Sequence, residues 1–236
     1  EGRRFRGVGV GSPGPADVKR GFIYEAQNLR WKNVPLKKLL ERKLRMPVMV
    51  EHDANCAALG ESMFWKKKNL VVLTLGTGLG SGVLIDGRVY RGKGIAVELG
   101  NMVIQARDPH DAGMYGYFED FVSARGIRRA AKKYGMPADP KALQELARKG
   151  DKKARRAYAE VGYYLGIGLA NVLNIFNPEL IVISGNISRA GNVLLRPALR
   201  EMKRRAYRQA VKDATVVISK LRDDANILGA AMLFKK

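Results

Sequence analysis

Val50-Glu51-His52-Asp53-Ala54-Asn55-Cys56-Ala57-Ala58-Leu59-Gly60-Glu61 is the most informative part of this sequence. An apolar run that begins at Met46 ends here in charged and polar residues, and a run of helix-forming residues follows. This pattern predicts a buried strand that leads into a helix. At the junction, the carboxylate of Asp53 is expected at the edge of a cleft.

About twenty residues further on, a second apolar run from Val71 to Leu75 enters a glycine-rich segment, Gly76-Thr77-Gly78-Leu79-Gly80-Ser81-Gly82. Glycines allow a tight turn whose backbone N–H groups can face a phosphate. An ordinary glycine-rich turn between two strands is the alternative. One carboxylate and one phosphate-binding turn together indicate phosphoryl transfer to a hydroxyl group.

Strands and helices alternate along the chain, which predicts an α/β architecture. Asp86-Gly87 between two short strands predicts a hairpin. Strands are expected at 6–10, 21–24, 47–50, 69–75, 82–86, 88–91, 180–183 and 215–218. Helices are expected at 35–44, 54–63, 119–134, 140–149, 152–176, 193–211 and 226–234.

The composition is that of a globular protein, with 236 residues, 46% hydrophobic residues and 26 glycines. No apolar run is long enough to span a bilayer, and no signal-peptide pattern opens the chain. The single cysteine, Cys56, excludes an internal disulfide and fits a reducing compartment. We therefore expect a cytoplasmic protein without a membrane partner.

The formal net charge of +21 allows two interpretations. The basic residues could form a nucleic-acid surface, or they could be solvated helix faces that also attract an anionic cosubstrate. Aromatic residues do not alternate with the basic clusters, and no helix-turn-helix, zinc-finger or RNP signature is present. We therefore favour the second interpretation and expect no nucleic-acid partner. The basic clusters lie at 66–68, 128–133, 152–156 and 196–212.

Taken in order, several motifs resemble those of the ROK family of sugar kinases and sugar-responsive repressors, which have the actin-like ATPase (ribonuclease H-like) fold. The resemblance runs from the first residues to Leu228-Gly229-Ala230-Ala231. It implies two lobes: residues 1–65 with 222–236 as a small sugar-binding lobe, and 66–221 as a large lobe. The matching segments are 9–15, 28–31, 51–61, 76–82, 98–101, Glu119 and 184–186.

The sequence departs from the family pattern in three places. The family's first strand and Asp-x-Gly-Gly-Thr phosphate turn have no counterpart, so we expect an incomplete first lobe. The family's zinc ligands, one His and three Cys, align with Asn101, His110, Ala112 and Tyr117, so we expect no structural zinc. His52 replaces the Asn that usually precedes the catalytic Asp.

The resemblance implies that Asp53 is the general base, which takes the proton from a sugar hydroxyl as that hydroxyl attacks the γ-phosphoryl group. The alternative is that Asp53 caps the following helix. Sugar contacts are expected from six side chains, although the two glutamates could be surface acids and Asn28 a turn residue. These side chains are Asn28, His52, Asn55, Glu98, Asn101 and Glu119.

Nucleotide contacts are expected from two loops. The glycine-rich turn would hold the phosphates through Gly76, Thr77, Gly78 and Gly80. The segment Ser184-Gly185-Asn186, at the end of a buried strand, would face the adenosine, although it could be a plain strand-to-helix loop.

The resulting prediction is an ATP- and Mg²⁺-dependent hexose kinase of glycolysis that acts on glucose at the 6-hydroxyl. We also expect a homodimer. Two alternatives remain open. One is a non-enzymatic, sugar-sensing regulator, and the other is a fragment that binds sugar without turnover.

Overall fold

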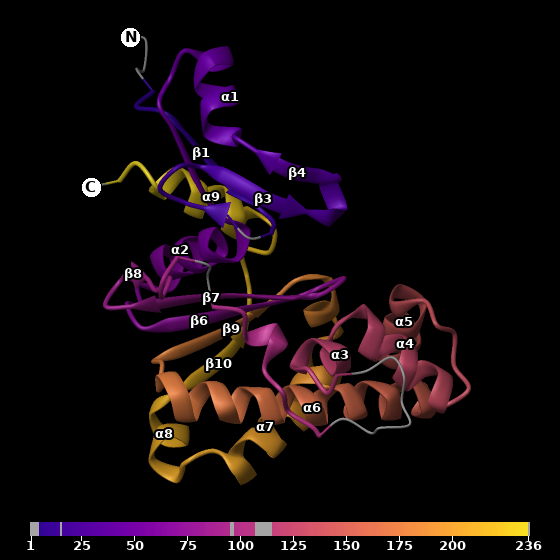
Figure 1. Ribbon diagram of the computed structural model, residues 1–236. Helices are drawn as coiled ribbons and strands as arrows, with labels where there is room; N and C mark the ends of the chain where they lie inside the picture. The colour runs from indigo at the N-terminus through magenta and orange to yellow at the C-terminus, as the bar shows by residue number, and fades with distance from the viewer. Residues whose placement is uncertain (1–4, 15, 95–96, 107–114, 236) are drawn as a thin grey trace. The chain divides into compact units, whose positions relative to one another are not determined.

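The computed structural model describes residues 5–14, 16–94, 97–106 and 115–235. The chain forms two compact units (Figure 1). The first unit comprises Glu1–Val72, Gly82–Val97 and Lys220–Lys236, and the second comprises Leu73–Ser81 and Glu98–Ser219. The predicted α/β class is confirmed. Among the described residues, no helix is both long and apolar enough to cross a membrane.

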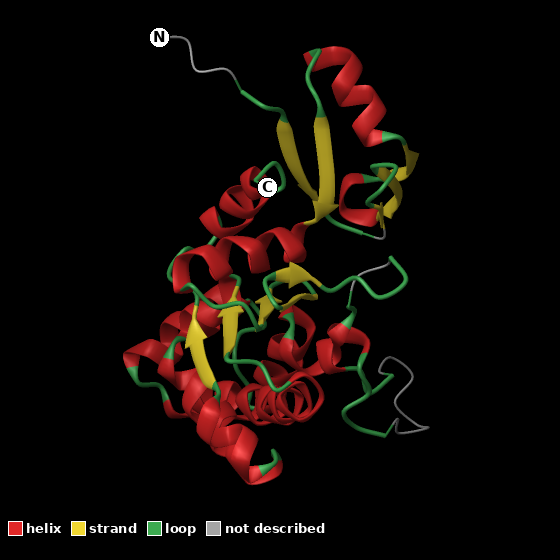
Figure 2. Ribbon diagram, turned by 90° about the vertical axis from the view of Figure 1, so that its left-hand side faces the viewer, coloured by secondary structure: helices red, strands yellow, loops and turns green. Residues whose placement is uncertain are grey.

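The first unit contains a pair of parallel strands, β1 (Val8–Ser12) and β5 (Val48–His52), in the register Val8–Val48 to Ser12–His52 (Figure 2). An antiparallel sheet of three short strands packs with them around a core that includes Ile23, Val48 and Val50. The strands of this sheet are β2 (Ala16–Asp17), β3 (Phe22–Ala26) and β4 (Trp31–Val34). The same part of the chain also contains η1 (Gln27–Leu29) and α1 (Leu36–Leu44).

Helix α2 (Asp53–Trp65) follows β5 directly and packs against α9 (Asp224–Met232), the last helix of the chain. Glycines allow this close approach. A Cβ atom on Gly229 would lie 1.7 Å from the carbonyl oxygen of Cys56, and one on Gly60 would lie 2.1 Å from that of Ala225. The strand–helix junction predicted around Asp53 is therefore present and is held by residues from both ends of the chain.

A five-stranded sheet has the order β10-β9-β6-β7-β8. The hairpin predicted at Asp86-Gly87 is confirmed, since Leu84 pairs with Val89 and both turn residues have positive φ. The strands are β6 (Leu70–Leu75), β7 (Leu79–Ile85), β8 (Arg88–Val89), β9 (Leu180–Ser184) and β10 (Thr215–Ile218).

The second unit is mostly helical, and its longest helix, α6 (Lys152–Phe176), lies beside α7 (Asn192–Arg205) (Figure 1). Gly162 and Gly166 face α7, whereas Gly168 faces the ring of Phe118. The remaining elements are η2 (Leu99–Asn101), α3 (Phe118–Val122), α4 (Ala124–Lys133), α5 (Pro140–Lys149), η3 (Asn186–Ala190) and α8 (Arg208–Asp213).

Two predicted helices were wrong in extent. The helix expected at 119–134 is divided into α3 and α4 at Ser123, whose Oγ accepts a hydrogen bond from the Arg125 N–H. The helix expected at 193–211 is divided into α7 and α8, because the Tyr207 N–H donates to Oδ1 of Asn174 at 2.8 Å instead of continuing a helix.

The glycine-rich turn is shorter than expected, because β7 already begins at Leu79. Gly80, Ser81 and Gly82 therefore lie in a strand. Gly82 serves packing within the first unit, since a Cβ atom there would lie 2.2 Å from the carbonyl oxygen of Ala54.

Candidate active site

Asp53 is the first residue of α2, at the carboxyl end of a parallel strand. Its side chain is 42% exposed, although Ala54 and Asn55 beside it are only 1% exposed. Oδ1 accepts a hydrogen bond from the Ala54 N–H at 2.7 Å. The N-cap position belongs to His52. Asp53 thus presents a carboxylate to solvent from a rigid junction.

Behind Asp53, Glu51 is completely buried and accepts four hydrogen bonds. Oε1 accepts from the His52 N–H and from Nδ2 of Asn55, each at 2.9 Å. Oε2 accepts from two guanidinium nitrogens of Arg91, one of them Nε at 2.9 Å. The carboxylate therefore fixes the backbone and the first helical turn on both sides of Asp53.

Two polar atoms next to Asp53 are buried without a hydrogen-bond partner among the described residues. They are Nδ1 of His52, which lies 3.5 Å from Oδ1 of Asp53, and Oδ1 of Asn55. A buried polar atom without a partner is costly, so such atoms commonly mark functional sites. Both residues were predicted sugar contacts, and that role remains a prediction.

Gly11 of β1 packs directly against the start of α2, where a Cβ atom would lie 3.4 Å from Cα of Asp53. The following turn reaches β3, because a Cβ atom on Gly14 would lie 1.9 Å from the carbonyl oxygen of Glu25. Asn28 lies just beyond β3, in η1, with an exposed side chain. The segment 11–14 thus connects the surroundings of Asp53 with those of Asn28 within the first unit.

In the second unit, the turn after β6 leaves two backbone donors available. The Gly76 N–H donates to the Gly78 carbonyl at 2.9 Å, and the Leu79 N–H donates to Oε2 of Glu119 at 2.7 Å. The N–H groups of Thr77 and Gly78 have no acceptor among the described residues. Two neighbouring free N–H groups fit a phosphate oxygen.

Glu119 lies in the first turn of α3 and closes over this turn. A Cβ atom on Gly78 would lie 2.6 Å from Oε2 of Glu119. The other predicted sugar contacts of this unit, Glu98 and Asn101, are exposed on either side of Gly100. Gly100 itself packs against Leu79, where a Cβ atom would lie 2.7 Å from the carbonyl oxygen. Glu98, Asn101 and Glu119 are therefore grouped around the end of the glycine turn.

The predicted adenosine loop lies beside the same turn. Gly185 has a φ of +83°, and a Cβ atom on it would lie 2.3 Å from the carbonyl oxygen of Leu75, the residue before Gly76. Ser184 is buried and Asn186 is exposed. Backbone from two neighbouring strands thus meets here, and the two predicted nucleotide-binding loops are adjacent.

The aligned zinc positions are only partly covered by the structure. His110 and Ala112 lie outside the described residues. Tyr117 forms a capping box with Asp120 at the start of α3, and Asn101 ends η2. Within the described ranges, no group of three or more His, Cys, Asp and Glu side chains is arranged to hold a metal ion. The absence of zinc stays a prediction.

Sequence patterns did not single out Arg91 or the pairing role of Glu51. A glutamate inside an apolar strand was a usable signal, because a buried carboxylate requires a charged partner. Its partner could not be named, since Arg91 lies forty residues away.

The model of the ROK family matches residues 1–236. The chain is 35% identical to a glucokinase from Halalkalibacterium halodurans, over 98% of this chain and 76% of that protein. It is 34% identical to a xylose repressor from Caldicellulosiruptor bescii, over 94% of this chain but only 61% of the repressor. Its structure matches that of a ROK family glucokinase from Streptomyces griseus in complex with glucose and AMPPNP, with a TM-score of 0.83, 30% identity, and coverage of 98% of this chain and 82% of that one.

Proposed function

Because this chain belongs to the ROK family and shares its actin-like ATPase fold, we propose that it transfers the γ-phosphoryl group of ATP to the 6-hydroxyl of glucose. Similarity to glucokinases over nearly the whole chain supports a sugar kinase. The solved relative in complex with glucose and AMPPNP supports the choice of sugar and nucleotide.

Asp53 would act as the general base. A sugar hydroxyl is a weak nucleophile near neutral pH, and a carboxylate within hydrogen-bond distance can take its proton as it attacks. Asp53 suits this role because its carboxylate is solvent-accessible while its backbone is held by the hydrogen bonds of Glu51. This exposed carboxylate on a buried, rigid junction is the observation that carries the proposal.

The nucleotide phosphates would be bound by the free N–H groups of Thr77 and Gly78, with the hydroxyl of Thr77 as a further donor. Fixed backbone dipoles stabilise the charge that develops on the transferring phosphoryl group without having to reorient. Mg²⁺ would enter with the nucleotide and neutralise phosphate charge. Ser184, Gly185 and Asn186 would contact the adenosine.

The sugar would be recognised by polar side chains that can bind several hydroxyl groups. Carboxamides both donate and accept, and carboxylates accept, so together they suit a polyhydroxylated ring. We assign this recognition to Asn28, His52, Asn55, Glu98, Asn101 and Glu119.

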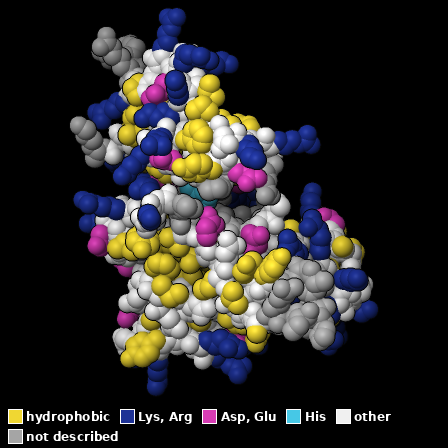
Figure 3. Space-filling view, viewed as in Figure 1, with side chains coloured by type: hydrophobic (Ala, Val, Ile, Leu, Met, Phe, Trp, Pro, Cys, Tyr) yellow, Lys and Arg dark blue, Asp and Glu magenta, His cyan; other side chains and the backbone are white. Residues whose placement is uncertain are grey.

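A sugar-responsive regulator is the second candidate, because the chain also resembles a xylose repressor. The accessible Asp53 carboxylate and the free donors of the glycine turn favour the kinase, since a sugar sensor needs neither. Basic side chains are also spread over the visible surface and not gathered in one patch (Figure 3). DNA binding that weakens steeply with salt would favour the regulator.

The test is an ATP–glucose assay that couples glucose 6-phosphate formation to NADPH production. Asp53→Asn keeps the size of the side chain but removes the base, and we expect kcat to fall at least about 100-fold. Asp224→Asn, in the first turn of α9, is the matched control and should retain activity. Wild-type turnover that survives Asp53→Asn would refute the assignment of the base.

A further inference from the structure

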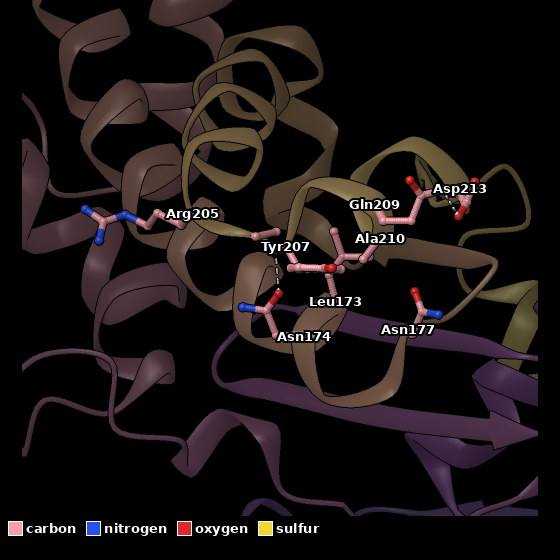
Figure 4. Close-up of a pocket in the computed structure, with 9 residues that line it drawn as sticks. Leu173, Asn174, Asn177, Arg205, Tyr207, Gln209, Ala210 and Asp213 are labelled. Atoms are coloured by element: carbon pink, nitrogen blue, oxygen red, sulfur yellow. Dashed lines mark hydrogen bonds between the residues drawn. The ribbon is translucent and has the colours of Figure 1, made fainter.

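The second unit contains a pocket of about 630 Å³ where the end of α6 meets the junction of α7 and α8 (Figure 4). Its volume lies within the range typical of small-molecule sites, about 300–1,000 Å³. None of its lining residues belongs to the candidate active site. The lining residues are Leu173, Asn174, Asn177, Arg205, Ala206, Tyr207, Gln209, Ala210 and Asp213.

The pocket exists because the chain leaves α7 at Arg205 and starts α8 only at Arg208. The Tyr207 N–H donates to Oδ1 of Asn174 at 2.8 Å, which ties this break to α6. Asn177 adopts the left-handed conformation, with a φ of +43°, and ends α6 at the opposite side of the pocket. The shape is therefore set by backbone geometry as well as by side chains.

The charges of the lining disfavour an anionic ligand. The guanidinium of Arg205 pairs with Glu201 and donates to the hydroxyl of Tyr163 at 3.1 Å, and in Figure 4 it extends away from the other lining residues. Asp213 adds a carboxylate, which accepts from Nε2 of Gln209 at 3.3 Å. A phosphate or carboxylate ligand would face the carboxylate of Asp213, and the one cation of this lining, Arg205, is already paired with Glu201.

The lining is rich in carboxamides with unused hydrogen-bonding capacity. The side chain of Asn177 and Nδ2 of Asn174 have no partner among the described residues. The side-chain carbonyl oxygen of Gln209 and one carboxylate oxygen of Asp213 can also accept a hydrogen bond. A ligand carrying several hydroxyl groups would satisfy such a mixture of donors and acceptors.

An exposed aromatic ring completes the pocket. Tyr207 is 73% exposed, whereas Leu173 beneath it is fully buried and Ala210 is 7% exposed (Figure 4). An exposed tyrosine ring offers a flat apolar face that remains close to polar groups. The C–H face of a pyranose ring matches this surface, while its hydroxyl groups can reach the carboxamides at the edge.

We propose that this pocket is a second carbohydrate site, which binds a neutral pyranose against Tyr207 with hydrogen bonds from Asn174, Asn177 and Gln209. The site is separate from the residues assigned to phosphoryl transfer, so it does not depend on catalysis. A neutral nucleoside is the competing ligand, because its base could also stack on the ring.

The experiment is a titration of the ¹⁵N-labelled full chain with D-glucose, D-xylose, maltose and adenosine, in which the side-chain amide signals are followed by NMR. The signals of Asn174, Asn177 and Gln209 are assigned by single substitution. We expect them to shift with the sugars at millimolar concentrations, and not with adenosine. Unshifted amide signals in the presence of sugar would overturn the proposal, and shifts with adenosine alone would assign the pocket to nucleosides.

Three variants test the contacts separately. Tyr207→Ala should weaken the affinity at this site at least about tenfold, whereas Tyr207→Phe, which keeps the ring, should weaken it less than about threefold. Asn177→Gly preserves the left-handed conformation and removes only the carboxamide, so it should weaken binding without unfolding α6. Equal losses in Tyr207→Phe and Tyr207→Ala would contradict stacking. Since the amide signals report on this pocket alone, failure of the kinase assay would leave the result unaffected.

Discussion

Glu51 and Arg91 form an ion pair in which the side chain of Glu51 is completely buried and the side chain of Arg91 remains 37% exposed. The pair links the end of β5 to the residues that follow β8. The same carboxylate also accepts from the backbone of His52 and from the side chain of Asn55. The residues before and after Asp53 are therefore held by one acidic group.

Replacing Glu51 by Gln should destabilise the protein by about 1.5–3 kcal/mol, because the partly exposed Arg91 loses its charge-assisted hydrogen bonds. The double variant Glu51→Leu/Arg91→Met should be less stable than Glu51→Gln, because leucine also removes the acceptor of the His52 N–H and of the buried Asn55 carboxamide. Urea unfolding measures both values. Unchanged stability in Glu51→Gln would contradict the structural role of the pair.

Gly78→Ala should destabilise the turn after β6, because the added Cβ atom would lie 2.6 Å from Oε2 of Glu119. The carboxylate must then move away from the Leu79 N–H, at a cost of about 1–3 kcal/mol for the lost charge-assisted hydrogen bond. If this turn binds phosphate, KM for ATP should rise as well.

Gly76→Ala is the matched control for stability, because a Cβ atom there meets nothing within 4 Å. Its free energy of unfolding should stay within about 0.5 kcal/mol of the wild-type value. If both alanine variants lose equal stability, flexibility of the loop, and not the contact with Glu119, would be the cause.

Cys56 should make the protein sensitive to alkaline conditions. Burial, followed by the nearby charges of Glu51 and Asp53, raises the pKa of its thiol from 9.0 to about 12. Between these values the folded state keeps a proton that the unfolded state has lost. The contribution of the Cys56 thiol to the free energy of unfolding is therefore fully present below pH 9. Above pH 9 this contribution decreases by about 1.4 kcal/mol per pH unit.

Comparison of wild type with Cys56→Ala between pH 8 and pH 11 isolates this effect. Burial also raises the pKa of Tyr158 to about 12, but that residue is present in both proteins and cancels in the difference. Parallel stability curves for the two proteins would exclude the thiol as the source. Below pH 9, the folded protein should also resist alkylation by iodoacetamide, since the thiolate is the reactive form.

Local signals in the sequence were sufficient for the elements that carry their own caps. The bounds of α5 and α6 agree with the prediction, because Asp139 and Asp151 cap them and Gly150 and Asn177 end them. The same holds for the junction of β5 and α2, where an apolar run changes abruptly into a helical pattern.

Tertiary contacts decided the elements that were missed. The helix predicted at 193–211 breaks because Asn174, more than thirty residues earlier, accepts from the Tyr207 N–H. The partner of Glu51 is equally remote in sequence. By contrast, Ser123 is a good N-cap residue, so the break between α3 and α4 could have been predicted. The chemical roles of Asp53 and its neighbours stay predictions.

The packing of α9 against α2 has a consequence for biosynthesis. The second unit has most of its residues in one continuous segment, Glu98–Ser219, but the first unit needs Lys220–Lys236 to cover α2. On the ribosome, the helix that begins with Asp53 must wait until the second unit has been translated before α9 can cover its glycine-lined face. The packing beneath Asp53 is therefore completed only by residues that follow the second unit in the sequence.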